Sequence, residues 1–261
     1  MQDIIDIERY PLDQADGPRY EALVKRARLD LAENGMFNLP GFLKDTARMH
    51  CVQSLLPRFA KDAFRHKRHH NIYFRNDIAD LPADHPALAQ CETVNSTLCG
   101  DQLADTVLDT LYKWPPFAAF LADVMEMPAL YPMDDPLARL NAMAYGEGEA
   151  LNWHFDRSEF TTTLLLQSPD RGGEFEYASD LRSDTDPNYQ GVADLLAGKL
   201  PRQIAQLTAG TLNVFRGKNT AHRVTPTSGA NPRMIAVFSY FDRPGVVFSE
   251  KEQLGFYGRT A

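Results

Sequence analysis

Eight short segments in the second half of the chain have the length and pattern of β-strands, and their number restricts the possible folds. Within them, apolar residues alternate with more polar ones or form short apolar runs, and turn sequences such as Asp170–Gly173 separate them. Eight short strands of this kind are typical of a jelly roll made of two packed sheets. The segments are 137–145, 151–155, 160–167, 174–177, 204–207, 211–215, 221–224 and 233–241.

The residues before this region have mainly helical patterns. We predict a short strand or extended turn at 36–43, and helices at 18–32, 44–64, 102–112 and 117–125. The basic run 65–70 is interpreted as the solvated end of the second helix, because cations there complement the helix dipole. We therefore expect one mostly β domain, 1–261, made of a mainly helical support region (1–136), a strand core (137–241) with an insertion over the barrel mouth (178–203), and a C-terminal tail (242–261).

The composition is that of a globular protein whose core needs no disulfides. The chain has 261 residues, of which 44% are hydrophobic, and a net charge of −8, which argues against a nucleic-acid partner. No segment has the pattern of a membrane span or a signal peptide. The cysteines, Cys51, Cys91 and Cys99, lack the spacing of a metal site and suit a reducing compartment. We expect a cytoplasmic protein that acts on a small molecule, and its oligomeric state is left open.

Three residues in the strand region have the chemistry of a metal site. His154 and Asp156 are two residues apart, so a strand points both to one face, and His222 lies on a later strand that can return beside them. Two imidazoles and one carboxylate occupy one face of an octahedral metal and leave the other face open, as in non-haem Fe(II) oxygenases. A lone histidine is usually an ordinary core or surface residue, but the joint order and strand context favour a metal site here.

Arg233 follows His222 by eleven residues and opens an apolar strand. A guanidinium binds a carboxylate through two parallel hydrogen bonds, so Arg233 is the candidate for the far carboxylate of a keto acid, with a surface salt bridge as the alternative. Further candidates for the same cosubstrate are polar residues on the predicted strands, each of them equally compatible with an ordinary strand role: Ser239, Thr163, Asn141 and Tyr145. Trp153, beside His154, is a candidate wall of the substrate site, and core packing explains it equally well.

The spacing of His154, Asp156, His222 and Arg233 resembles that of the Fe(II)/2-oxoglutarate-dependent dioxygenases, which have a double-stranded β-helix, or cupin-like, fold. The resemblance covers about residues 137–241. It implies that the two histidines and the aspartate bind Fe(II), that 2-oxoglutarate and O₂ are cosubstrates, and that an unactivated C–H bond is hydroxylated with release of succinate and CO₂. The protein's own task is then to orient the reactants and exclude water.

Within that superfamily, three segments are similar to the group of free-amino-acid hydroxylases and radical halogenases: Trp153–Asp156, Gly172–Tyr177 and Phe256–Arg259. In the halogenases a glycine replaces the carboxylate ligand and opens a place for chloride. Asp156 fills that position here, so the resemblance implies hydroxylation. In the lysine-acting members an acidic residue follows and helps to bind the substrate ammonium, whereas this chain has Arg157.

Arg157 therefore favours an acidic or neutral amino acid as substrate. Arg75 lies among aromatic residues and is a candidate for the substrate carboxylate, although a surface arginine explains it equally well. Two other functions stay open. One is a peptidyl hydroxylase of the prolyl type, which needs an open groove, and the other is a cupin-like metal-binding protein without turnover. A zinc hydrolase uses similar ligands, but the sequence offers no evident general base beside them.

Overall fold

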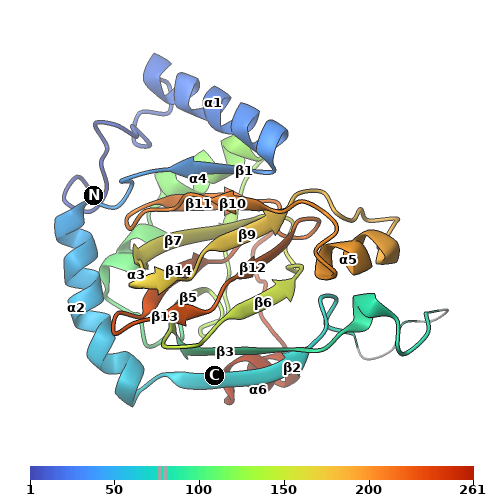
Figure 1. Cartoon of the computed structure of the whole chain (residues 1–261). Coiled ribbons are helices and arrows are strands. Elements are labelled where there is room, and N and C mark those ends of the chain that lie inside the picture. The colour runs from blue at the N-terminus through green and yellow to red at the C-terminus, as the bar shows by residue number, and fades with distance from the viewer. Residues whose placement is uncertain (76–77, 79–80) are drawn as a thin grey trace.

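Two antiparallel sheets face each other in the computed structural model, which describes residues 1–75, 78 and 81–261 (Figure 1). The larger sheet has the strand order β1-β11-β7-β14-β5-β3-β2, and the smaller one has the order β10-β9-β12-β6. The eight predicted strands are all present, four in each sheet, as β5 (Leu140–Tyr145), β6 (Leu151–His154), β7 (Thr161–Gln167), β9 (Phe175–Ala178), β10 (Gln203–Ala205), β11 (Leu212–Phe215), β12 (Ala221–Val224) and β14 (Arg233–Phe238). The predicted jelly-roll core is confirmed.

Strands from the N-terminal region extend the larger sheet at both edges. β1 (Met36–Leu39) pairs with β11, while β3 (Cys91–Leu98) pairs with β5 and carries β2 (Phe64–His70) as the outermost strand. The support region is therefore less helical than expected. Four further short strands form two small ribbons: β4 (Tyr131–Pro132) with β15 (Tyr240–Phe241), and β8 (Arg171–Gly172) with β13 (Thr227–Ser228).

The basic run 65–70 belongs to β2, and its interpretation as a helix end was wrong. Every residue of β2 pairs with one of β3, and burial alternates along the strand, so that Arg65, Lys67 and His69 are exposed. His66, Arg68 and His70 lie on the opposite, less exposed face of this strand. The sequence conceals this strand because its inward positions are themselves polar, which removes the apolar period that normally identifies an amphipathic strand.

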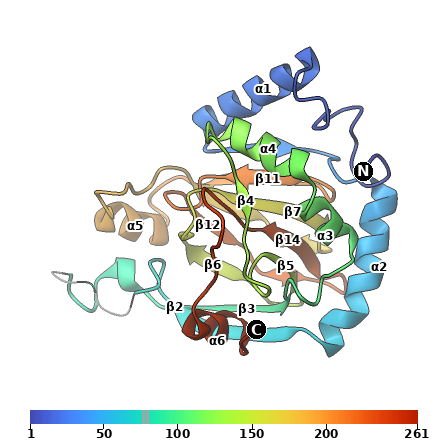
Figure 2. The same ribbon diagram turned by 180° about the vertical axis from the view of Figure 1, so that it is seen from behind.

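Helices cover the other face of the larger sheet, and their apolar side chains form the largest core with it (Figure 2). In this core, Leu140, Leu164, Val214 and Phe238 of the strands are all buried. The helices are α1 (Pro18–Asn34), α2 (Asp45–Lys61), α3 (Val107–Tyr112) and α4 (Pro115–Val124). No helix within the described ranges is both long and apolar enough to cross a bilayer.

The insertion 178–203 packs on the outer face of the smaller sheet. Its helix α5 (Tyr189–Leu196) buries Val192 and Leu195 against Trp153 of β6 and Ala221 of β12, together with a 3₁₀ turn, η1 (Pro86–Leu88). These strand residues alternate with His154 and His222, which point to the other face. The helix of the insertion therefore supports the sheet from behind, whereas the sequence suggested that it lies over the barrel mouth.

The C-terminal tail contains a helix, α6 (Glu250–Tyr257), that lies beside β2 (Figures 1 and 2). Ser249 and Glu252 form a capping box at its start. Asp135 is fully buried beneath the helix. Its Oδ2 accepts hydrogen bonds from Gln253 Nε2 (2.8 Å) and the Phe248 amide (2.9 Å), and its Oδ1 accepts two more backbone N–H groups. This one carboxylate therefore connects α6 to the start of β5.

We expect Asp135→Asn to lower the free energy of unfolding by about 2 kcal/mol at pH 7, since hydrogen bonds to a charged group contribute about 1.5–3 kcal/mol. Burial raises the pKa of Asp135, but the Gln253 amide and the backbone N–H donors outweigh it and hold the pKa below its usual range. The contribution is then complete above the unfolded pKa of about 3.9 and is lost as the pH falls through the folded value. Urea unfolding at pH 7 and pH 3 measures this.

The neighbouring exposed carboxylate of Asp134, which accepts only the Gly245 amide, provides the control. Asp134→Asn should change the free energy of unfolding by less than about 0.5 kcal/mol. A difference between wild type and Asp135→Asn that does not shrink at low pH would contradict an ionised Asp135 in the folded state.

Candidate metal centre

The two candidate histidines face each other on neighbouring strands of the smaller sheet. His154 ends β6 and is the register partner of His222 in β12, and the ring centroids are 4.1 Å apart. Both imidazoles are buried. Phe215 and Phe175 of the two sheets pack against the His222 ring, at 4.8 and 5.6 Å between centroids. Strand pairing and these two aromatic rings therefore fix the positions of both imidazoles.

Backbone hydrogen bonds set the tautomer of each imidazole. Nδ1 of His154 donates to the Asn152 carbonyl at 2.8 Å, and Nδ1 of His222 donates to the Thr220 carbonyl at 2.9 Å. A carbonyl oxygen only accepts, so Nδ1 carries the proton and the lone pair of Nε2 is free. This is how metal-binding histidines are usually oriented.

Asp156 completes the set from the loop after β6. Its carboxylate oxygens lie 3.4 Å from Nε2 of His154 and 3.4 Å from Nε2 of His222, and one ligand atom of each residue lies within 4.8 Å of the others. Atoms that each bind one ion at about 2.1 Å are about 3 Å apart on adjacent octahedral corners. Nitrogen and oxygen donors in this number fit an iron-type ion with an open face.

The protonation states also suit a metal. Burial raises the pKa of Asp156, but the His222 and His154 imidazoles beside it hold that pKa well below its usual range. Burial lowers the pKa of His154, and the neighbouring His222 lowers it further. A neutral imidazole and an ionised carboxylate are the forms that bind metals.

Two residues that hold Asp156 in place were missed in the sequence. Thr161 Oγ1 donates to Asp156 Oδ2 at 2.5 Å, and the Asp156 amide donates to the Gly217 carbonyl at 3.0 Å. A Cβ atom on Gly217 would lie less than 3.0 Å from both the Asp156 carboxylate and the Thr161 hydroxyl. Only glycine therefore fits at position 217. In the sequence this residue appears only as a glycine five residues before His222, and such a spacing is too common to indicate a role.

We expect Gly217→Ala to weaken Fe(II) binding by about 10–100-fold, the usual effect of disturbing groups that orient a ligand. The added methyl group pushes the Asp156 carboxylate away from the two imidazoles. Anaerobic titration with Fe(II) measures the affinity. Gly255→Ala in α6 is the matched control because nothing lies within 4 Å of its Cβ position. Equal affinities for the two variants would contradict the role of Gly217.

Arg233 is buried between the sheets at the start of β14, opposite Tyr145 of β5 in the register. Its side chain is 2% exposed, and its guanidinium lies 5.9 Å from the Tyr145 ring centroid. Nε donates to the Gly173 carbonyl at 3.2 Å, whereas Nη1 is buried without a hydrogen-bond partner among the described residues. Burial lowers the pKa of Arg233. Since no carboxylate of the described residues forms an ion pair with this buried cation, an anionic ligand suits it.

The other cosubstrate candidates already have protein partners. Thr163 donates to the Asn213 carbonyl at 3.3 Å. β14 ends one residue before Ser239, whose hydroxyl donates to the Ala138 carbonyl at 2.9 Å. Asn141 donates to two nearby carbonyls and accepts from the Tyr257 hydroxyl of α6. Tyr145 alone lies directly against Arg233.

The substrate candidates are dispersed. Trp153 is on the opposite face of β6 from His154, where it packs against α5 and under the Arg223 guanidinium, so it does not wall the metal site. Arg157 is an exposed residue that pairs with Glu252 of α6 at 2.6 Å. Arg75 is exposed after a turn held by the Asn71 side chain.

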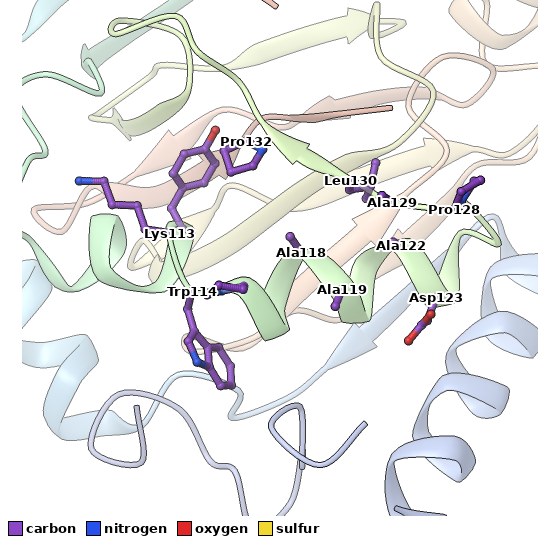
Figure 3. Close-up of a pocket in the computed structure, with 12 residues that line it drawn as sticks. Lys113, Trp114, Ala118, Ala119, Ala122, Asp123, Pro128, Ala129, Leu130 and Pro132 are labelled. Carbon is purple, nitrogen blue, oxygen red and sulfur yellow. The ribbon is translucent and has the colours of Figure 1, made fainter. Parts of the chain in front are cut away.

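Two cavities lie elsewhere in the described structure. One, of about 330 Å³, lies between α4 and β4 on the helical side and is lined by Trp114, Ala118, Ala122 and Leu130, among others (Figure 3). The second, of about 240 Å³, includes Arg157. Neither contains a member of the triad. The first has mostly apolar walls without converging polar groups, so the triad and Arg233 identify the site better than cavity size does.

Comparisons with known proteins agree with this assignment. The family model described as Halogenase D matches residues 22–246. Solved structures with a similar fold include the epimerase SnoN in complex with Fe³⁺, alpha-ketoglutarate and nogalamycin RO (TM-score 0.56, 16% identity, 85% of this chain and 84% of that chain). No curated protein sequence matches the chain.

Two further solved structures show the same fold. A Pseudomonas putida prolyl-4-hydroxylase has a TM-score of 0.54 and 14% identity, covering 85% of this chain and 100% of its own. An oxidoreductase of the 2OG-Fe(II) oxygenase family from Burkholderia pseudomallei has a TM-score of 0.53 and 16% identity, covering 85% and 92%. The predicted fold class and enzyme class are confirmed, and the predicted pair of iron and 2-oxoglutarate is that of this oxygenase fold. The chain belongs to the Halogenase D family, and its fold is that of solved 2-oxoglutarate-dependent oxygenases.

Proposed function

We propose that this protein is an Fe(II)- and 2-oxoglutarate-dependent hydroxylase of a small molecule, namely a free amino acid with an acidic or neutral side chain. The observation that carries the proposal is the complete ligand set His154, Asp156 and His222 in one cluster whose two imidazoles are buried. Arg233 supports it, because its buried and unpaired Nη1 suits the far carboxylate of 2-oxoglutarate. A metal-binding protein without turnover has no need of such an arginine.

The chain's own groups have separate tasks in this reaction. His154, Asp156 and His222 would hold the iron, and Arg233 would orient 2-oxoglutarate by a charged, two-pronged hydrogen bond. When bound, iron and 2-oxoglutarate supply the oxidation: the substrate C–H, O₂ and 2-oxoglutarate give the alcohol, succinate and CO₂. Tyr145 and the phenylalanines around His222 keep water away from the buried groups.

Hydroxylation is favoured over halogenation because the carboxylate place is filled. Asp156 is held by Thr161, by the Gly217 carbonyl and by the close approach of Gly217 itself. A chloride ion would have to displace this fixed anion. The family name Halogenase D therefore describes the relatives of this chain, and Asp156 favours a different outcome here.

A prolyl-type peptidyl hydroxylase is the second candidate, and the position of α5 makes it a real one. The helix α5 packs behind the smaller sheet, so this helix does not cover the site against a peptide. The Pseudomonas putida prolyl-4-hydroxylase has a similar fold. We favour the small-molecule substrate because α6 and the residues after β2 lie close to the metal side of the barrel.

We expect acidic or neutral L-amino acids to be turned over at least about tenfold better than lysine or ornithine, because the Arg157 guanidinium repels a side-chain ammonium. Succinate release over the common L-amino acids, checked for a matching hydroxylated product, measures this. Arg157→Gln should narrow the gap, whereas Arg171→Gln, an exposed arginine of the β8 ribbon, should not. Efficient coupled turnover of lysine would contradict the assignment of Arg157, and coupled turnover only with prolyl peptides would favour the second candidate.

A further inference from the structure

The inward face of β2 and β3 contains buried polar atoms that have no protein partner. Nε of Arg68 and Oδ1 of Asn95 are both buried and lack a hydrogen bond within the described part of the chain. Asn95 is 0% exposed, and its amide nitrogen donates to Thr97 Oγ1, so only its carbonyl oxygen is left over. Such atoms cost about 1–3 kcal/mol each when nothing binds them.

The register places these two atoms close together. Arg68 is opposite Thr93, and His66 is opposite Asn95, so Arg68 and Asn95 are diagonal neighbours on one face of the β2–β3 pair. Side chains at such positions are within reach of one another. One small molecule can therefore contact both atoms. Arg68 would donate a hydrogen bond to an anionic group of that molecule, and Asn95 would accept one from its amino group.

Arg68 also supplies the positive charge of this face at neutral pH. Burial lowers the pKa of His66 and of His70 to about 4, and the charge of Arg68 contributes to both shifts, so the two imidazoles are neutral. No carboxylate of the described residues pairs with Arg68. The Arg157 guanidinium, which is ion-paired with Glu252, lies 5.2 Å from the Phe256 ring centroid, and that of Arg68 lies 5.5 Å from the same ring.

Phe74 connects this face to the metal centre. The Arg68 guanidinium lies 4.3 Å from the Phe74 ring centroid, and the same ring is 5.9 Å from the His154 ring. Arg68 and His154 are therefore no more than about 10 Å apart across Phe74. The Phe74 backbone is in the left-handed region (φ 53°), and its side chain is 38% exposed. Strained backbone and an exposed aromatic ring beside a metal site are typical of a ligand contact.

Building on the proposed function, we propose that Arg68 and Asn95 bind the head group of an α-amino acid substrate, Arg68 its carboxylate and Asn95 its ammonium, with the side chain passing over Phe74 toward the metal. This arrangement holds the α-carbon at the β2–β3 face, so oxidation occurs on the substrate's side chain. Arg75, the sequence candidate for the substrate carboxylate, is exposed, lies seven residues after Arg68 and is not needed for this subsite.

The experiment measures substrate binding without turnover. Anaerobic protein with Fe(II) and 2-oxoglutarate is titrated with L-leucine, L-glutamine and L-glutamate, and the visible band of the iron-bound keto acid reports both assembly and substrate binding. Arg68→Met keeps the stem and removes the charge, and Asn95→Leu keeps the size and removes the acceptor. Each variant should lower the affinity for the best-binding amino acid by about 10–100-fold, which corresponds to the loss of one hydrogen bond to a charged group. The affinity for 2-oxoglutarate should stay unchanged.

Analogues of the ligand make the assignment specific. For leucine these are 3-methylbutylamine, which lacks the carboxylate, and 4-methylpentanoate, which lacks the ammonium; the other two probes have corresponding analogues. Arg68→Met should bind the amine as tightly as wild-type protein does, because the amine lacks the carboxylate that Arg68 would contact. Asn95→Leu should likewise bind the acid as tightly as wild type, because the acid lacks the ammonium. Lys67→Met, on the outward face of β2, is the control for each titration.

Three results would overturn the subsite while leaving the oxygenase intact. In the first, the affinity lost through a variant and the affinity lost through the matching analogue add up. In the second, Arg75→Met weakens amino-acid binding and Arg68→Met does not. In the third, wild-type protein shows the band but binds none of the amino acids. Absence of the band in wild-type protein would instead refute the proposed function itself. A normal band in Arg68→Met and Asn95→Leu shows that both variants are folded.

Discussion

Alanine at His154, Asp156 or His222 is expected to reduce 2-oxoglutarate-dependent turnover by far more than about 100-fold, the upper range for disturbing only the groups around a metal site. Each variant removes one of three donors, so the ion is held more weakly and in a changed geometry. Anaerobic Fe(II) with 2-oxoglutarate should give a weak visible charge-transfer band in wild-type protein, and a much weaker band or none in the variants.

His69→Ala is the matched control for the triad, because His69 is a solvent-exposed histidine on the outward face of β2. It should retain the band and the turnover. A wild-type protein without the band, together with unchanged Fe(II) binding in His222→Ala, would mean that the metal is bound elsewhere or not at all.

Arg233→Met is expected to raise the apparent KM for 2-oxoglutarate by at least about 30-fold, while the KM for the substrate changes little. Truncating one partner of a buried, hydrogen-bonded charge pair costs about 2–5 kcal/mol. Arg233→Lys keeps the charge but loses the two-pronged geometry, so its KM should lie between those of wild type and Arg233→Met.

Thermal unfolding tests the same arginine without turnover. In wild-type protein, 2-oxoglutarate with Mn(II) should raise the melting temperature through binding to the folded state. Arg233→Met should lose that increase. Its own melting temperature without ligand should be close to that of wild type or higher, since the buried Nη1 has no partner among the described residues to lose. A large destabilisation without ligand, or equal effects on both KM values, would make Arg233 a structural residue.

Local pattern was enough to predict the jelly-roll core and the three candidate metal ligands that the fold brings together. The eight strands were recognisable because apolar runs and turn residues are local signals, and the boundaries differ from the structure by only a few residues. The two-residue spacing of His154 and Asp156 placed both toward one side of the chain, although Asp156 lies in the loop after β6. Donor chemistry supplied the rest, because two imidazoles, one carboxylate and an open face are the ligand set of non-haem Fe(II) oxygenases.

Tertiary structure decided which atoms meet. Only the pairing of β6 with β12 sets His154 opposite His222, and only the packed loop shows that Gly217 must lack a side chain beside Asp156. The strand β2 was mistaken for a helix end because its inward residues are polar. Hydrophobic periodicity reveals a strand only where its inward side chains are apolar, and the inward side chains of β2 are polar.

The same reason separates Arg233 from Arg68. Arg233 opens an apolar strand after a recognisable motif, so the sequence predicted it as a ligand residue, and in the structure it is buried with no partner for Nη1 among the described residues. Arg68 lies within a run of six basic residues, where no local signal distinguishes an inward side chain from its exposed neighbours. Arg68 comes close to Asn95 only because β2 pairs with β3 in this register. It comes close to Phe74 only because the turn after β2 folds back toward His154. Neither contact follows from the order of residues along the chain.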